Sequence, residues 1–174
     1  MLILHNQCGG PDPEIPEDIL KIPISLEVTR FERILDAAGP EDLPALKKEY
    51  PYFFPERFAD SSWVSILNDT LQQQLREQVG RSFADFRPYV TELELFFKHV
   101  AYYFPRTPIP RVITVTSNVD YNDKVILTDS LLLIGLDNYL GAEHPFYEGL
   151  ANYIARDLDP AFIVSDVADD FNRK

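Results

Sequence analysis

The sequence has few of the features that assign a chemistry at first sight. It contains a single cysteine, Cys8, so an internal disulfide is excluded and packing alone has to hold the fold. No apolar run approaches the roughly 18 residues of a membrane-spanning helix. The seven glycines form no G-x-G-x-x-G motif and no P-loop, and a G-x-S-x-G elbow is missing as well. The common nucleotide-binding and serine-hydrolase patterns are therefore excluded.

Basic residues are scarce. The chain has 16 Lys and Arg against 28 Asp and Glu, which gives a net charge of -12. A nucleic-acid backbone or an anionic membrane surface would be repelled by such a protein. We therefore expect no nucleic-acid partner, and a membrane contact only through a lipid anchor.

Histidine is also rare, and the three histidines lie far apart with no H-E-x-x-H between them. His144 and Glu148 are spaced as metal ligands on a helix would be, but Pro145 and Gly149 indicate a loop. We expect no metal and no other cofactor, and the sequence identifies no catalytic residue.

The β-rich part of the chain runs from 110 to 141. Alternating or continuous apolar residues predict strands over 111–117, 124–128 and 131–137, and the last is apolar enough to be covered on both faces. The breaks between them hold six and two residues, too few for a parallel crossover, so we predict an antiparallel meander. A fourth candidate is an edge strand over 21–29, where Pro23 excludes a central position.

Helical spacing of apolar residues accounts for most of the rest. It predicts helices over 30–38, 41–50, 61–80, 85–103, 150–158 and 160–174. The predicted class is α+β, with a small antiparallel sheet of three to four strands and helices packed mainly on one face. The last helix carries an apolar stripe. We expect its Ile163 and Val167 to lie in the core and Phe171 to form a contact surface.

The N-terminal segment differs from the rest in composition. A short apolar stretch precedes Cys8-Gly9-Gly10, and a Pro-rich acidic spacer follows over 11–18. This is the order found in a bacterial lipoprotein after its signal peptide. The stretch before Cys8 is too short for a signal h-region, and small residues are missing just before the cysteine. Two interpretations stay open, a lipid anchor at Cys8 and an ordinary thiol. We predict a flexible tether over 1–20 and a single α+β domain over 21–174.

One loop holds most of the candidate binding residues. Asp137 follows the most apolar strand, and bonding to the backbone of its turn is favoured over a direct functional role. Tyrosines in the loop that follows suit flat apolar or sugar ligands. The interaction candidates are Asp137, Tyr139, His144, Tyr147, Glu148 and Phe171.

Several motifs carry a resemblance to a known family. They include Arg30-Phe31-Glu32, Tyr102-Tyr103-Phe104-Pro105 and Gly135-Leu136-Asp137-x-Tyr139-Leu140-Gly141, and the last two are the most specific. The sequence resembles the gliding-motility lipoprotein GldB family of Bacteroidota over roughly residues 20–170.

The resemblance implies a cell-envelope lipoprotein, membrane-anchored or periplasmic, that serves gliding and the associated secretion apparatus. It also implies a fold similar to that of zincin-like peptidases, although the late helix here lacks their metal-binding pair. Family members continue beyond this length, so the chain is expected to be the N-terminal portion of a longer domain or a shortened member. The leading hypothesis is a non-enzymatic scaffold that binds other envelope proteins of the motility and secretion apparatus. A peptidase-like hydrolase and a small-ligand module are the alternatives.

Overall fold

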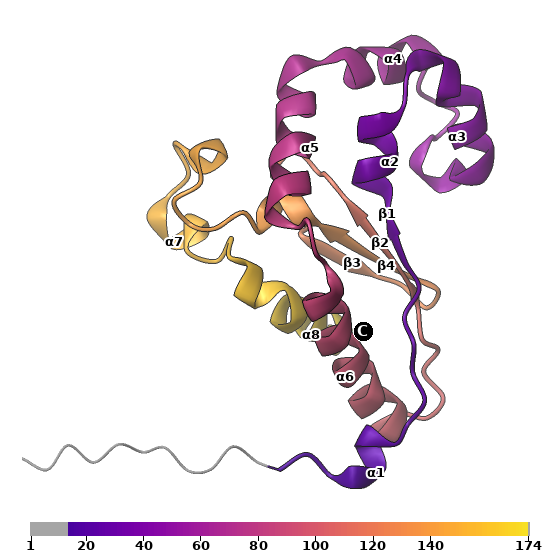
Figure 1. Cartoon of the computed structure of the whole chain (residues 1–174), viewed down its shortest axis with the longest axis vertical. Helices are drawn as coiled ribbons and strands as arrows, with labels where there is room; N and C mark the ends of the chain where they lie inside the picture. The colour runs from indigo at the N-terminus through magenta and orange to yellow at the C-terminus, as the bar shows by residue number, and fades with distance from the viewer. Residues whose placement is uncertain (1–13, 174) are drawn as a thin grey trace, which may run out of the picture.

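The computed structural model describes residues 14–173, and its centre is a four-stranded sheet with the order β1-β2-β4-β3. Figure 1 shows the sheet between layers of helices. The strands are β1 (Val28–Arg30), β2 (Arg111–Val115), β3 (Val125–Leu127) and β4 (Leu131–Gly135). The predicted α+β class is confirmed.

The sheet is mixed, so the predicted antiparallel meander is wrong for two of its three strand pairs. β1 and β2 are parallel, β2 and β4 are parallel, and only β3 and β4 are antiparallel. In the register, Val112 pairs with Leu132, and Ile134 pairs with Val125. The prediction assumed that consecutive strands pair. Instead β4 inserts between β3 and β2, so β3 itself supplies the length that a parallel crossover needs.

The edge strand is shorter than predicted, because only Val28–Arg30 of 21–29 pairs with β2. Its edge position is confirmed. Glu17–Leu20, which the sequence placed in the tether, form helix α1 with Ile19 fully buried. Residues 1–13, including Cys8, lie outside the described part of the chain.

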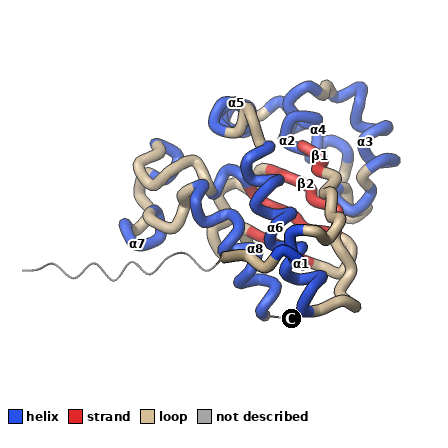
Figure 2. The backbone as a smooth tube through the Cα atoms, turned by 60° about the horizontal axis from the view of Figure 1, so that its bottom comes forward, coloured by secondary structure: helices blue, strands red, loops and turns tan. Residues whose placement is uncertain are grey.

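One face of the sheet is covered by three long helices. They are the end of α5 (Thr70–Ser82), α6 (Arg87–Tyr103) and α8 (Ile163–Asn172), which form one core with Val112, Leu132 and Ile134. Figure 2 shows α6 and α8 side by side over this face. Ile163 and Val167 are fully buried in this core, as predicted.

The opposite face is covered too, so the prediction of helices mainly on one face is wrong. Its cover consists of α2 (Phe31–Ala37), α3 (Leu43–Glu49) and α4 (Asp60–Asn68), which pack on Ile113 and Leu133. The physical reason is the continuous apolar run in β2 and β4. Neighbouring residues of a strand point to opposite faces, so both faces need cover.

The helix predicted over 61–80 is two helices. The chain breaks at Asp69, whose Oδ1 accepts the Gln72 amide N–H at 2.8 Å and caps α5. Short 3-10 turns complete the connections at Pro40–Asp42, Pro51–Phe53, Leu136–Asn138, Pro145–Tyr147 and Pro160–Phe162. Together with α7 (Asn152–Ala155), the segment after β4 forms an arm that projects from the sheet (Figure 1). None of the described helices has the length and apolar character to cross a bilayer.

Candidate functional site

The carboxyl ends of the three parallel strands lie at one edge of the sheet and gather its buried polar groups. Four buried polar residues lie at this edge: Glu32 just after β1, Thr114 near the end of β2, and Asp137 and Asn138 just after β4. In sheets with parallel strands this edge is where ligands usually bind. It is therefore the first place to look for function.

The Asp137 carboxylate holds the loop that follows β2. Its Oδ1 accepts the Ser117 amide at 2.9 Å, and its Oδ2 accepts the Val119 amide at 2.7 Å. Burial raises the pKa of this carboxyl, and the two amide bonds oppose the shift. The predicted role of Asp137 was to bond backbone in its own turn. The amides bonded here belong to a loop 18 to 20 residues earlier.

The loop held by Asp137 has an unusual backbone. Asn118 and Val119 both have left-handed conformations, with φ of 62° and 55°. Asparagine tolerates this region, but a β-branched residue such as valine is strained there. The bond from Asp137 to the Val119 amide therefore stabilises a conformation that the local sequence disfavours. The Gln72 side chain of α5 adds a bond of 2.6 Å to the Asn118 oxygen.

Close packing fixes the same corner. The Asn138 side-chain nitrogen donates to Ser117 Oγ at 2.9 Å and to the Gly135 carbonyl at 3.3 Å. A Cβ at Gly135 would lie 2.9 Å from both Asn138 Nδ2 and Ser117 Oγ, so any side chain here would displace the pair that forms this hydrogen bond. Asn138 Oδ1 is buried and has no hydrogen-bond partner among the described residues.

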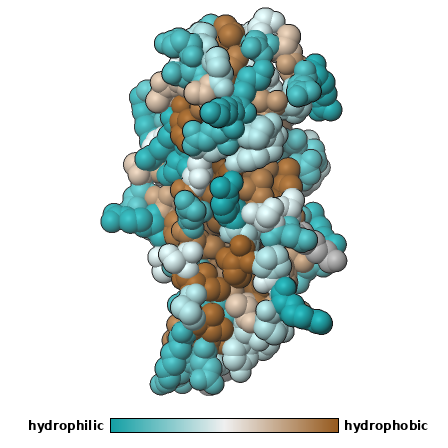
Figure 3. Space-filling model, turned by 90° about the vertical axis from the view of Figure 1, so that its right-hand side faces the viewer, coloured by the Kyte–Doolittle hydropathy of each residue, from teal (hydrophilic) through white to brown (hydrophobic). Residues whose placement is uncertain are grey.

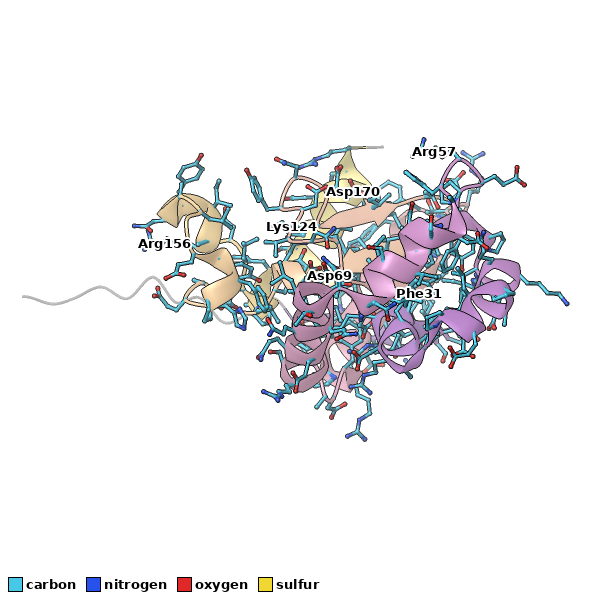
Figure 4. All side chains as sticks on the ribbon, turned by 90° about the horizontal axis from the view of Figure 1, so that it is seen from above. Phe31, Arg57, Asp69, Lys124, Arg156 and Asp170 are labelled. Carbon is cyan, nitrogen blue, oxygen red and sulfur yellow. The ribbon has the colours of Figure 1, made fainter. Side chains whose placement is uncertain are left out.

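A second network ties this corner to α8. The Tyr139 hydroxyl donates to Asp166 Oδ2 at 2.7 Å, and Lys124 Nζ lies 2.6 Å from the same oxygen. Lys124 Nζ also lies 5.5 Å from the centre of the Tyr139 ring. Burial and the Asp166 carboxylate raise the pKa of Tyr139, so the phenol stays protonated and acts as a donor. Figure 4 labels Lys124 in the middle of the molecule, beside the strands.

The first strand ends in a third network. Glu32 is buried, and its carboxylate accepts from Thr114 Oγ1 of β2 at 2.6 Å and from Arg30 Nε at 2.6 Å. Arg30 also donates to the Phe83 carbonyl at the end of α5. Burial lowers the pKa of the Arg30 guanidinium, and Glu32 opposes that shift. This network joins β1, β2 and α5.

Tyr147 closes the loop after β4 into a compact unit. Its hydroxyl donates to the Asp137 carbonyl at 2.7 Å and accepts the Leu140 amide at 2.8 Å. Burial raises the pKa of this phenol as well. Tyr147, predicted as an interaction residue, is thus buried and stabilises the loop that contains it.

The outer side of this loop lines an open cleft of about 720 Å³ on the projecting arm. The exposed charged side chains at its walls are Glu143, Glu148 and Arg156. His144 is half-buried and its Nδ1 accepts the Phe146 amide at 3.3 Å. Burial lowers the pKa of His144, which keeps it neutral near pH 7. Figure 4 places Arg156 on the arm, away from the sheet.

The structure thus divides the predicted site residues into two groups. Asp137, Tyr139 and Tyr147 form the buried bracing, whereas His144 and Glu148 face the cleft. Among residues 14–173, no group of three His, Cys, Asp or Glu side chains is close enough to hold a metal ion. Phe171 lies elsewhere. It is half-buried at the end of α8, against Phe96 and Phe104.

The sequence does not single out Lys124 or Ser117. An antiparallel meander would place the strand over 124–128 between those over 111–117 and 131–137, so a whole strand would separate the ends of those two strands. Their parallel pairing instead brings Ser117 and Asp137 together. The polar residues that directly follow each strand are the signal that would have found this site, once the parallel pairing was assumed.

Comparison with known proteins decides the family. The family model for the gliding motility protein GldB, a lipoprotein family, matches residues 12–174, which is nearly the whole chain. The chain belongs to the GldB family. Membership indicates involvement in gliding motility and a lipoprotein held at a membrane of the cell envelope. The resemblance of the sequence motifs to this family is confirmed.

Neither the curated proteins nor the solved structures contain a match to this chain. The likeness to zincin-like peptidases therefore stays a prediction.

Proposed function

We propose that this GldB-family protein is a non-enzymatic scaffold that holds another envelope protein of the gliding and secretion machinery in the cleft of its projecting arm. Cys8 is its proposed lipid anchor, and it lies outside the described residues. The support comes from how the polar groups of the site are used.

The observation that carries the proposal is that the buried polar side chains of the site bond to backbone groups of the protein itself. Both oxygens of Asp137 accept amides of the 117–119 loop, and the Tyr147 hydroxyl bonds two backbone groups of the 137–140 turn. A general acid or base needs a free proton site that faces the substrate. These groups instead rigidify the 117–119 loop and the 137–140 turn. A rigid surface suits recognition, because little conformational entropy is lost when a partner binds.

The cleft itself favours a polypeptide. It is open and mostly polar, and its exposed Glu143, Glu148 and Arg156 offer charges of both signs. Charges of both signs at a rim give specificity and register to a protein–protein contact. A small polar ligand is the second candidate, because a volume of about 720 Å³ lies within the range of ligand sites.

Site-specific photo-crosslinking in gliding cells tests the proposal. A photoreactive residue is placed at Glu148 or Arg156 in the cleft, and at exposed Lys48 of α3 as the control. We expect both cleft positions to give the same discrete crosslinked envelope protein, and position 48 to give none. A cell that glides normally while neither cleft position crosslinks to protein would contradict the scaffold role.

A further inference from the structure

Four large apolar side chains are exposed around the C-terminal end of α6. They are Leu20 of α1, Tyr102 and Tyr103 in the last turn of α6, and Phe104 directly after it, with exposed fractions of 48%, 46%, 61% and 54%. We call them the aromatic end. Figure 3 shows apolar surface along the middle of one side of the molecule, with hydrophilic residues above and below it. Phe104 packs partly on the core through Phe171 of α8, and the cleft accounts for none of the four residues.

Specific contacts place these side chains around the C-terminal end of α6. Lys98 Nζ of α6 donates to the Leu20 carbonyl at 3.0 Å, which fixes α1 on α6. Tyr102 lies one helical turn after Lys98, hence on the same side of α6 as Leu20. The ring centroids of Tyr102 and Tyr103 are 5.0 Å apart. The Phe104 amide donates to the Val100 carbonyl, and the Phe104 ring lies 5.6 Å from the Phe171 ring of α8 while staying 54% exposed. Figure 1 shows α1 and this end of α6 together at the bottom of the molecule.

We propose that the aromatic end inserts into the interface of a lipid bilayer and sets the orientation of the domain on the membrane. The length of chain between Cys8 and α1 identifies this occupant. Eight residues lie between Cys8 and Glu17, where α1 begins, and an extended chain spans at most about 3.6 Å per residue, or roughly 30 Å. A lipid on Cys8 therefore keeps the end of the molecule with α1 close to the bilayer. The orientation rests on the proposed anchor, whereas the affinity of the aromatic end for lipid does not.

The chemistry of the aromatic end suits this position. Tyrosine is enriched at membrane–water interfaces, because its ring enters the headgroup layer while its hydroxyl stays in water. Phe104 and Leu20 supply purely apolar surface. The net charge of -12 opposes contact with anionic lipid, and charges of both signs flank the aromatic end: Lys98 and Arg106 on either side of 102–104, and exposed Glu17 and Asp18 in α1. Apolar insertion therefore drives the contact, and a zwitterionic bilayer suffices.

Because Cys8 is the only cysteine, the full chain can be coupled at this residue to vesicles of phosphatidylcholine that contain a maleimide-headgroup lipid. Hydrogen exchange is then compared between the tethered and the free chain. We expect the amides of 99–110 to exchange about tenfold more slowly on the vesicle. The double variant Tyr103→Ser with Phe104→Ser should lose this protection. Tyr153→Ser, which removes a 73% exposed tyrosine from α7, should keep it.

The proposal is overturned by equal exchange in tethered and free chains, by protection that survives the double variant, or by protection only on vesicles with added phosphatidylglycerol. Protection that rises with the density of tethered chains would instead identify a second copy of the chain as the occupant, and would also overturn it. Because the anchor here is chemical, a Cys8 that carries no lipid in cells would refute the anchor of the proposed function and leave this result unchanged.

Discussion

The Asp137 carboxylate lies 2.7 Å from the amide nitrogen of Val119, a β-branched residue held in the left-handed conformation at φ 55°. The two residues come from the ends of neighbouring parallel strands. Their bond joins the loop after β2 to the turn after β4, and the Tyr147 hydroxyl bonds the Asp137 carbonyl in that turn. Asp137 therefore holds the loop after β2 through its carboxylate and the proposed binding loop through its carbonyl.

Replacing Asp137 by Asn should destabilise the fold. One side-chain oxygen is lost, and the buried amide of Val119 then faces an NH2 group, which costs about 1–3 kcal/mol. Chemical denaturation measures the loss. Asp123→Asn, at an exposed position of the same connection between β2 and β3, should change the free energy of unfolding by less than about 0.5 kcal/mol. Equal effects of the two substitutions would contradict the bracing role.

Asp137 should also give a specific pH dependence. Burial raises its folded-state pKa above the ordinary value of 3.8. A carboxyl with a raised pKa contributes most to folding when it is protonated, and this contribution is lost as pH rises through the folded-state pKa. The free energy of unfolding of the wild type minus that of Asp137→Asn should therefore fall as pH rises from about 3.8. A difference that grows with pH would show that the amide bonds outweigh burial.

Lys124 and Tyr139 both bond Asp166, and their contributions to the free energy of unfolding should differ. Lys124→Met leaves a largely buried carboxylate without its cation, and we expect a loss of about 1–3 kcal/mol after allowing for partial solvent exposure. Tyr139→Phe removes one hydrogen bond while Lys124 stays, which costs about 1 kcal/mol. Thermal and chemical unfolding of both variants measures the order. A larger loss for Tyr139→Phe would contradict it.

The stripe on α8 should divide between core and surface. Ile163 is fully buried, so Ile163→Ala should cost about 2–5 kcal/mol. Phe171 is half-buried against Phe96 and Phe104, so Phe171→Ala should cost less than the roughly 3–5 kcal/mol lost at a fully buried phenylalanine. Equilibrium unfolding of both variants at one pH gives the comparison. If Phe171→Ala proves the costlier change, the division is wrong.

Local patterns in the sequence predict most of the elements. Helical spacing identifies α6 to within two residues at its start, and the alternation in 111–117 identifies β2. These predictions succeed because hydrophobic period and proline breaks act within one element. The break at Asp69 is missed because apolar spacing continues across it. Only the cap of Gln72 by Asp69 shows that a new helix begins.

Strand order and the site depend on pairings that no local pattern reports. Nothing within 111–137 tells whether the strand that starts at Arg111 pairs with Val125 or with Leu131, because all three strands are apolar. The short loops favoured pairing with Val125. In the structure the strand pairs with Leu131, which places the more apolar β4 inside the sheet with both faces covered. The partnership of Ser117 with Asp137 follows from that choice alone, and so does the bracing of the candidate site.

The most direct test of the central claim is the gliding speed of cells whose only copy of this protein carries a substitution in the cleft. His144→Asn removes the imidazole but keeps an acceptor for the Phe146 amide, so it should leave gliding unchanged if the site binds without catalysing. Glu143→Lys with Glu148→Lys reverses the exposed charge of the cleft and should abolish gliding while the protein stays folded and abundant. Loss of gliding in His144→Asn, with normal gliding in the charge-reversed variant, would contradict the binding role and favour chemistry at His144.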